Sequence, residues 1–476
     1  MQRTKKIGLV FGPALFFLIQ FLPITLVSEK ADAVLAVAAW MVLWWVTETV
    51  NIAVTALLPL LLFPLLKVTE IAAVGANYGS PIIFLFFGGF VLALALEKVN
   101  LHKRIALNIV KLTGTTPNKV VLGFMIATAL MSMWISNTAA TVVMLPIAIS
   151  VIRLLINAKD GFTKAGKNFA LSMMLGIAFA ANAGGVATVI GTPPNSVLIG
   201  LLENQYNIQI SFLKWMCFGL PFSIIMVTAV YFVLVKLMFP CKGIVLTSSG
   251  NIIHEEIEKL GKISKEEKRV LLIFAITIFL WITRTIINDV FPGLKLSDTI
   301  ISLMGAISLF AIPIRLKTGD FILEWKDTEK LAWGILILFG GGLALAKGMA
   351  SSGLVALITE TIAAGNFNSL ATVSMLIILM LFMTELMSNV ALVAVLAPVV
   401  AGIAIGLELP ILNVLIPVTM ASSCAFMLPM ATPPNAIVFA SGYVKVNQMV
   451  SAGILLNFIA VGLLILYYQF VIPLFF

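Results

Sequence analysis

Two matched sets of uncharged polar residues interrupt the apolar segments of this chain. Ser136-Asn137-Thr138 and Ser388-Asn389-Val390 each follow a Phe-Gly-Gly by 49 positions. Thr192-Pro193-Pro194-Asn195 and Thr432-Pro433-Pro434-Asn435 come after them in the same order. Polar, helix-breaking residues at membrane depth persist only where they face protein or a water-filled cavity. A duplicated set of them indicates the binding site of a carrier protein.

The Ser-Asn pairs offer hydroxyls, amide donors and carbonyl acceptors, all without charge. If each pair lies at the tip of a helical hairpin, the second limb adds free backbone N–H groups and a partial positive charge, which favour an anion. We therefore expect the two tips to bind the two carboxylates of one small molecule. Thr138 adds a hydroxyl at the first tip, whereas Val390 adds none at the second, so the two tips differ.

Oxygen ligands for a hard cation accompany the same motifs. Ser132 and Thr384 stand four residues before the tip serines, and on a helix that spacing puts both hydroxyls on one face. Prolines interrupt a helix, which frees the carbonyls just before them, at Gly191 and Ala431. Hydroxyls and unwound carbonyls suit Na⁺. No lysine or arginine lies near either tip in the sequence, so a bound dianion would need such cations as counter-charge.

Each of these residues also has a purely structural interpretation. Ser, Thr and Asn in membrane helices commonly bond neighbouring helices, and paired glycines commonly mark close packing. The matched order of the two sets favours a functional interpretation for the Ser-Asn pairs, whereas we interpret the Gly-Gly pairs as packing points. Glu48 and Glu385 lie at or within apolar runs. An acid in a membrane is a functional candidate, for protons among others, although Glu385 also suits a position that faces water beside the cavity.

The composition indicates a polytopic membrane protein. Hydrophobic residues make up 61% of the 476 residues and charged residues only 11%, more apolar surface than a soluble fold can bury. The net charge of +9 does not predict nucleic-acid binding, because the basic residues collect in short loops. His102 and His254 lie in charged, loop-like stretches, and the three cysteines form no pattern. We therefore expect neither an enzyme nor an organic cofactor.

Segment lengths predict the topology. Residues 120–152 would run about 50 Å as one helix, against about 30 Å of hydrocarbon, so we predict a re-entrant hairpin there and another at 369–407. Helices at 169–201 and 409–440 should break at their Thr-Pro-Pro-Asn. Together with an inner-surface helix at 101–112, whose counterpart at 352–364 lies outside, this gives an all-α inverted repeat with eleven crossings.

The distribution of basic residues orients this topology. With the N-terminus in the cytoplasm and the C-terminus outside, 24 of the 30 lysines and arginines fall on the inner side, as the positive-inside rule requires. The charged segment 241–268 then becomes a cytoplasmic linker between the two halves. Short loops favour the cell membrane of a bacterium.

These motifs resemble those of the divalent anion/sodium symporter (DASS) family, the INDY-like di- and tricarboxylate carriers. The resemblance extends from Thr47-Glu48 and the stretch Asn51–Pro59 to the last Pro-Pro-Asn. It implies a homodimer in the lipid bilayer and an elevator mechanism. A scaffold (1–112 and 270–364) would hold the dimer, while a transport domain (118–240 and 366–476) would move across the membrane.

The resemblance also implies roles for individual residues. The implied substrate contacts are Ser136, Asn137, Ser388, Asn389, Thr432 and Pro433, beside Thr138 and Val390 at the tips. The implied first Na⁺ site consists of Ser132, Ser136, Asn137 and Gly191. The implied second Na⁺ site consists of Thr384, the carbonyl of Met387, Asn389 and Ala431.

The sequence therefore favours a Na⁺-coupled carrier that takes up C4-dicarboxylates such as succinate, malate or fumarate by alternating access. Two alternatives keep the same fold: a sodium-independent anion exchanger, or a carrier for citrate, 2-oxoglutarate or sulfate. An anion channel is a more remote alternative, because hairpin tips that close at mid-membrane do not line a continuous pore.

Overall fold

Helices dominate the computed structural model, which describes residues 3–21, 28–114, 116–153, 163–241, 249–315, 320–365 and 367–476. Parts of the expected segments, at 22–27, 154–162 and 242–248 and at residue 366, lie outside the described residues. Seven described helical segments are long and apolar enough to span a membrane. Their number does not itself fix the count of crossings, because several shorter apolar helices accompany them.

The first half begins with helices that pack around one long helix of the second half. In order they are α1 (Arg3–Phe21), α2 (Glu29–Thr47), α3 (Ile52–Thr55), α4 (Leu58–Leu65), α5 (Ile71–Tyr78), α6 (Pro81–Lys98) and α7 (Leu101–Thr113). From α2 to α6, each packs against α16 (Trp333–Ser351). These contacts join parts of the chain that lie far apart in sequence.

The rest of the first half contains the first hairpin and the first broken helix. It comprises α8 (Pro117–Ser132), α9 (Asn137–Arg153), α10 (Lys164–Gly185), α11 (Pro193–Tyr206), α12 (Phe212–Tyr231) and the π-helix η1 (Phe232–Met238). A charged helix, α13 (Ser249–Lys259), then leads into the second half. The predicted break at Thr192-Pro193 is therefore present, between α10 and α11.

The second half repeats this order after two further helices. It comprises α14 (Lys265–Val290), α15 (Asp298–Ala311), β1 (Pro313–Arg315), β2 (Asp320–Phe321), η2 (Trp325–Lys330), α16, α17 (Leu354–Ala364), α18 (Ser369–Met383), α19 (Asn389–Gly406), α20 (Ile411–Ala421), α21 (Pro433–Ala440), α22 (Val446–Leu466), η3 (Tyr467–Val471) and η4 (Ile472–Leu474). The two-stranded antiparallel sheet β1–β2 corrects the all-α expectation. Its strands are only three and two residues long.

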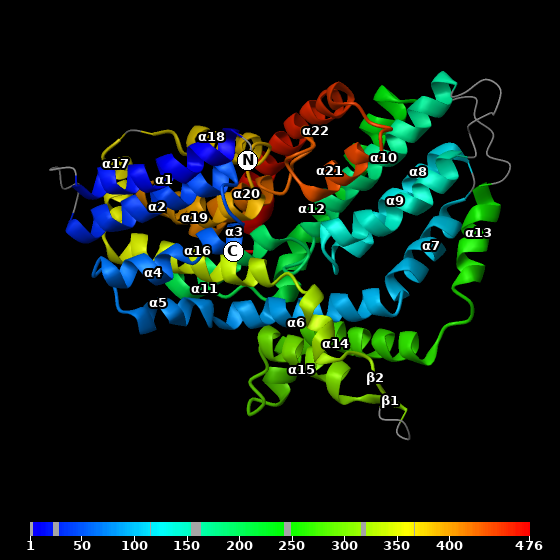
Figure 1. Ribbon diagram of the computed structural model, residues 1–476, viewed down its shortest axis with the longest axis horizontal. Helices are drawn as coiled ribbons and strands as arrows, with labels where there is room; N and C mark the ends of the chain where they lie inside the picture. The colour runs from blue at the N-terminus through cyan, green and yellow to red at the C-terminus, as the bar shows by residue number, and fades with distance from the viewer. Residues whose placement is uncertain are drawn as a thin grey trace.

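The internal repeat is visible in the order of elements. A glycine-containing long helix (α6, α16), a short helix (α7, α17), a hairpin (α8–α9, α18–α19), a broken helix (α10–α11, α20–α21) and a long helix (α12, α22) follow one another twice. In Figure 1 the first hairpin lies toward the end that carries α13, and the second lies toward the opposite end, which carries α17. The two hairpins therefore enter the molecule from opposite ends.

Both Phe-Gly-Gly sequences mark close helix packing. A Cβ on Gly88 would collide with Ser302 of α15, and a Cβ on Gly341 would collide with the backbone of Ala56. The interpretation of these glycines as packing points is therefore confirmed.

Ion pairs attach α7 to the segment between the two halves. Arg104 of α7 binds both carboxylate oxygens of Glu267 at 2.6 and 3.1 Å and donates to the carbonyls of Leu260 and Gly261. Lys103 binds Glu256 of α13 at 2.9 Å. The hydrogen bonds from Lys103 and Lys259 lower the pKa of Glu256 below its ordinary value.

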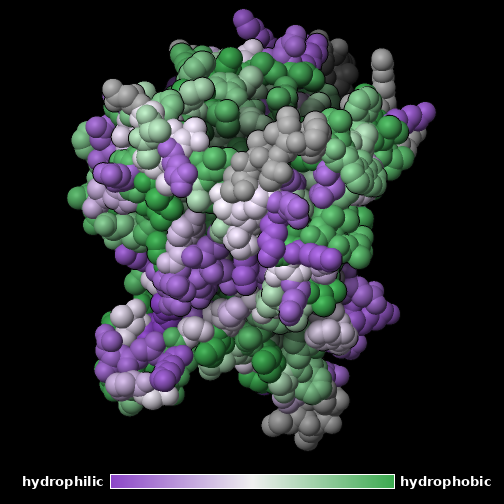
Figure 2. Space-filling model, turned by 90° about the vertical axis from the view of Figure 1, so that its left-hand side faces the viewer, coloured by the Kyte–Doolittle hydropathy of each residue, from purple (hydrophilic) through white to green (hydrophobic). Residues whose placement is uncertain are grey.

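The surface is apolar where helices have no protein neighbour. On α14 the residues Leu272, Phe279 and Ile286 are 59%, 61% and 65% exposed. A helix of a soluble protein rarely exposes so much apolar surface on one face. Figure 2 views the end of the molecule that carries α17, where hydrophilic residues gather across the middle of the face between hydrophobic regions. Polar end faces and apolar sides are what a bilayer imposes.

Candidate functional site

The four polar motifs coincide with four helix N-termini. α9 begins at Asn137 and α19 at Asn389, directly after the two tip serines, while α11 and α21 begin at Pro193 and Pro433. Proline suits the first position of a helix because the N–H that it lacks would have no intrahelical partner there. Each N-terminus carries free N–H groups and a partial positive charge.

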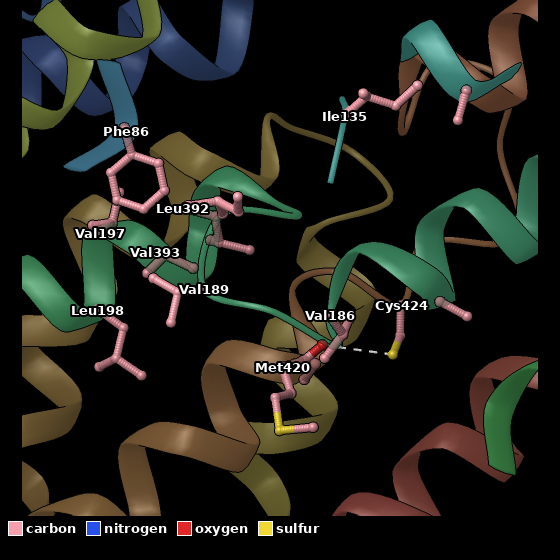
Figure 3. Close-up of a cluster of buried hydrophobic side chains, with 14 of the residues drawn as sticks. Phe86, Ile135, Val186, Val189, Val197, Leu198, Leu392, Val393, Met420 and Cys424 are labelled. Carbon is pink, nitrogen blue, oxygen red and sulfur yellow. Dashed lines mark hydrogen bonds between the residues drawn. The ribbon is translucent and has the colours of Figure 1, made fainter. Parts of the chain in front are cut away.

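These N-termini are brought together by packing across the two halves. α9 packs against α21, and α11 packs against α19, so the second limb of each hairpin contacts the broken helix of the other half. Figure 3 shows Val186 of the first break beside Met420 and Cys424, which flank the start of the second. The two breaks therefore adjoin each other inside the core.

A cluster of oxygen atoms surrounds Asn137. The Ser132 hydroxyl lies 2.5 Å from Asn137 Oδ1 and 2.8 Å from the carbonyl oxygen of Ala181 in α10. A Cβ on Gly185 would lie 2.5 Å from Asn137 Oδ1 and 3.1 Å from the carbonyl oxygen of Gly191. The structure thus brings together Ser132, Asn137 and Gly191, three of the four residues expected at the first Na⁺ site, and adds Ala181.

An equivalent cluster surrounds Asn389. The Thr384 hydroxyl lies 2.6 Å from Asn389 Oδ1 and 2.6 Å from the carbonyl oxygen of Ser422. Met387 lies in the same tip, and Ala431 precedes Thr432, the N-cap of α21; both are buried. In each cluster a single hydroxyl lies close to two acceptor oxygens, the asparagine Oδ1 and a backbone carbonyl. Because the hydroxyl has only one proton, it can donate to one of them, and the other oxygen–oxygen contact has no hydrogen bond. A cation relieves such a contact, and carbonyl, amide and hydroxyl oxygens suit Na⁺.

The expected substrate residues border these clusters with different exposure. Ser136 is exposed, and its hydroxyl accepts the Ala139 N–H at 3.1 Å. Thr138, Ser388 and Val390 are half-buried, as are both tip asparagines, whereas Thr432 is buried and Pro433 exposed. Accessible hydroxyls and N–H groups therefore lie next to buried oxygen clusters, an arrangement that can hold an anion over cations.

Each break is held open by the asparagine of its Thr-Pro-Pro-Asn. Asn195 Nδ2 donates to the carbonyls of Val186 and Thr188 at 3.3 and 2.9 Å. Asn435 Nδ2 donates to the carbonyls of Ala425 and Leu428, both at 3.1 Å. These bonds satisfy carbonyls that the interrupted helix leaves without partners. The fourth motif residue therefore has a positioning role that its spacing alone did not reveal.

Glu385 fastens the second hairpin tip to the second break. Its Oε1 accepts the N–H groups of Phe426 and Met427 at 2.8 and 2.9 Å, and its Oε2 accepts that of Leu428 at 3.0 Å. Asn457 of α22 also donates to Oε1, at 2.8 Å. The expectation that Glu385 faces water is therefore wrong: its side chain is buried, because the free N–H groups of the break compensate for its desolvation.

In the first half the hairpin tip is also fastened to its break, but here the tip offers a backbone carbonyl and the break offers a hydroxyl donor. Met133 directly follows Ser132, as Glu385 follows Thr384, and its carbonyl accepts the Thr188 hydroxyl at 2.6 Å. Thr188 precedes Thr192 by four positions, as Leu428 precedes Thr432. Among the described residues, the second half alone therefore places a carboxylate beside its oxygen cluster.

A site of uncharged oxygens, enclosed where two inverted halves of a helical membrane protein meet, is the site of a secondary transporter. The comparisons with known proteins agree. The family model described as the sodium:sulfate symporter transmembrane region matches residues 3–476. The chain belongs to this family, the divalent anion/sodium symporters, and the resemblance inferred from the motifs is confirmed.

Relatives and solved structures extend this result. The chain is 39% identical to the sodium-dependent dicarboxylate transporter SdcS of Staphylococcus saprophyticus, covering 98% of this chain and 92% of the relative. It is 38% identical to SdcS of Staphylococcus aureus strain USA300, covering 98% and 91%. Its fold is similar to that of the YdaH transporter of Alcanivorax borkumensis, with a TM-score of 0.56 and 13% identity over 84% of this chain and 88% of the other. MtrF of Neisseria gonorrhoeae has a TM-score of 0.55 with 12% identity, covering 99% and 96%.

Proposed function

We propose that this protein takes up C4-dicarboxylates such as succinate, malate or fumarate across the cell membrane, driven by a Na⁺ gradient. The observation that carries the proposal is the pair of equivalent oxygen clusters, at Ser132–Asn137 and at Thr384–Asn389. Relatives at 38–39% identity are named sodium-dependent dicarboxylate transporters, which supports both the coupling ion and the substrate class.

Charge balance explains why the substrate and the cation travel together. The two tips offer hydroxyls and helix N-termini to a dianion, but the stretch from Gly348 to Val444 contains no lysine or arginine. The N-termini at the two tips, with about half an elementary charge each, compensate only about one of the dianion's two negative charges. Na⁺ ions in the two clusters supply the missing charge beside the carboxylates. Each ion therefore raises the affinity for the substrate, and the substrate raises the affinity for each ion by the same factor.

The transport step is proposed to be of the elevator type. The transport domain, 118–240 with 366–476, contains both hairpins and both broken helices and would carry the site across the membrane. The scaffold, 1–112 with 270–364, would remain in place in a homodimer, with the linker 241–268 and the N-terminus in the cytoplasm and the C-terminus outside. The opposite placement of the two hairpins supports this assignment, as does the excess of basic residues on one side.

Radiolabelled succinate uptake tests the proposal directly. We expect purified protein in liposomes to accumulate succinate when Na⁺ is present outside and not when choline replaces it. Asn137→Ala and Asn389→Ala should each abolish uptake, because each removes the amide shared by an anion tip and an oxygen cluster. The matched control is Asn108→Ala, a change of an exposed asparagine on α7 that bonds only within its own helix.

Two outcomes would contradict the proposal. Normal uptake by both tip variants would remove the site assignment. Succinate exchange from preloaded vesicles that proceeds equally well without Na⁺ would replace symport by anion exchange. Competition with citrate, 2-oxoglutarate and sulfate in the same assay identifies which acid is preferred.

A further inference from the structure

Asn182 of α10 joins the first broken helix to the second. Its side chain is buried, with 1% exposed. Its Nδ2 lies 3.0 Å from the carbonyl oxygen of Ala425, 3.1 Å from Thr432 Oγ1 and 3.3 Å from Asn435 Oδ1. The amide has two protons, so the two shorter contacts, to Ala425 and Thr432, take them.

The direction of these bonds follows from the surrounding atoms. If the amide were reversed, its oxygen would face the Ala425 carbonyl and Asn435 Oδ1, two acceptors that cannot donate. The orientation with Nδ2 toward Thr432 therefore satisfies more partners. In this orientation the Thr432 hydroxyl accepts a hydrogen bond through its oxygen.

An accepted bond leaves the Thr432 proton available. Thr432 is the N-cap of α21, yet its side chain makes no capping bond to that helix. Among the described residues, no hydrogen bond is recorded in which the Thr432 hydroxyl is the donor. Thr432 directly precedes Pro433, which is exposed at the N-terminus of α21. With its oxygen accepting from Asn182, this hydroxyl keeps its proton free to donate to an anion.

The equivalent contact, from Ser423 of the second half to Thr192 of the first, is absent among the described residues. Ser132 bonds the carbonyl of Ala181 as Thr384 bonds that of Ser422, so the residues that follow, Asn182 and Ser423, occupy equivalent positions. Ser423 is buried, and its hydroxyl has no hydrogen-bond partner among the described residues. A serine side chain is too short to span what the asparagine spans, and Thr192 shows no equivalent bond to the other half.

We propose that Asn182 is a positioning residue for substrate binding. It fixes the Thr432 hydroxyl as a donor toward one carboxylate of the substrate, so that a residue of the first half sets the geometry of a contact in the second. This inference depends on the proposed function and on the substrate contact that the family resemblance implies for Thr432. Asn435 also donates to the Ala425 carbonyl, so the shape of the break does not depend on Asn182 alone.

A double-mutant cycle tests the proposal. Full-length wild-type protein, Asn182→Ala, Thr432→Ala and the double variant are compared in liposomes for succinate KM at saturating Na⁺. We expect each single variant to raise the KM about five- to tenfold, the effect of one neutral hydrogen bond. The double variant should be no worse than Thr432→Ala, because Asn182 acts through that hydroxyl. At saturating succinate, the Na⁺ concentration for half-maximal uptake should stay unchanged.

Further variants guard against loss of folding. Asn182→Ser copies the residue of the other half and should be well folded by size-exclusion profile, yet should raise the succinate KM as Asn182→Ala does. Ser423→Ala, the matched control, should leave the KM unchanged. Thr432→Ser retains the hydroxyl, so adding Asn182→Ala to this variant should still raise the succinate KM.

The possible failures are distinguishable. If wild-type protein takes up succinate but the two single effects multiply in the double variant, Asn182 acts independently of Thr432 and the inference is overturned. An unchanged KM in a folded Asn182→Ser variant overturns it as well. If wild-type protein takes up no dicarboxylate in the presence of Na⁺, the proposed function fails, and this inference fails with it.

Discussion

At the scale of single residues, one geometry is built twice from different side chains. A hydroxyl four residues before the tip serine bonds an asparagine oxygen and a carbonyl of the broken helix, with Ser132 in one half and Thr384 in the other. What the two clusters share is the arrangement of oxygen atoms, not the residue type. A cation ligand is therefore expected to tolerate a Ser–Thr exchange but not the loss of the hydroxyl.

Replacing the hydroxyls is predicted to weaken Na⁺ dependence selectively. Thr384→Ala and Ser132→Ala should each raise the Na⁺ concentration for half-maximal succinate uptake about tenfold, the equivalent of about 1.4 kcal/mol. Thr384→Ser should stay close to wild type. Thr128→Ala is the control, because Thr128 lies one turn before Ser132 and bonds only the Phe124 carbonyl of its own helix. An unchanged Na⁺ titration in both alanine variants would rule out these clusters as cation sites.

Spacing revealed Ser132 and Thr384 because both lie one helical turn from the tip serine. Spacing did not reveal Glu385 or Asn182, whose partners lie 41 to 72 and 243 to 253 positions away. Such contacts depend on where a break in one helix meets a neighbouring element, and a single sequence contains no periodic signal for that. An acid within an apolar run was the only indication that Glu385 needed donors around it.

At the scale of elements, the sequence predicted where the helices break but not which residues fasten the hairpin tips to these breaks. The paired prolines begin α11 and α21, and they stop these helices from continuing back toward α10 and α20, because proline lacks the N–H and clashes with the preceding turn. The interruptions between α8 and α9 and between α18 and α19 lie in segments too long for one crossing, while the re-entrant course of these hairpins stays a prediction. The sheet β1–β2 was missed, because its strands are three and two residues long and give no alternating pattern. Each hairpin tip is also tied to its break, through Met133 and Thr188 in the first half and through Glu385 in the second.

Loosening the second attachment is predicted to affect one cation cluster only. Glu385→Gln keeps the size of the side chain but removes its charge and directs an amide group at an N–H donor of the break. Losing a buried hydrogen bond to a charged group costs about 1.5–3 kcal/mol. We expect the Na⁺ requirement to rise at least tenfold and the Hill coefficient for Na⁺ to fall toward one. Met133→Leu, at the equivalent place, keeps the carbonyl that Thr188 bonds and should have no effect. A Glu385→Gln variant with wild-type Na⁺ cooperativity would show that the tip is held by other contacts.

At the scale of the whole molecule, the proposed scaffold and transport domain meet at a definable contact. The Phe212 N–H at the start of α12 donates to Asp298 Oδ2 of α15 at 2.9 Å, and the rings of Phe212 and Trp281 stack with centroids 4.3 Å apart. Arg284 pairs with the same aspartate at 3.1 Å. If the transport domain moves as a unit, this contact has to break in each transport cycle.

A disulfide across that contact is predicted to stop transport without abolishing binding. In a background lacking the three native cysteines, Asp298→Cys with Phe212→Cys should lose succinate uptake on oxidation and regain it on reduction, because the bridge joins the proposed transport domain to the proposed scaffold. Na⁺-dependent succinate binding should persist, since the oxygen clusters lie wholly within the transport domain. Ser28→Cys with Ser352→Cys, whose parent side chain and carbonyl lie 3.4 Å apart within the scaffold, is the matched pair and should transport when oxidised. Full uptake by the completely oxidised Asp298–Phe212 variant would show that these two segments keep their places during transport.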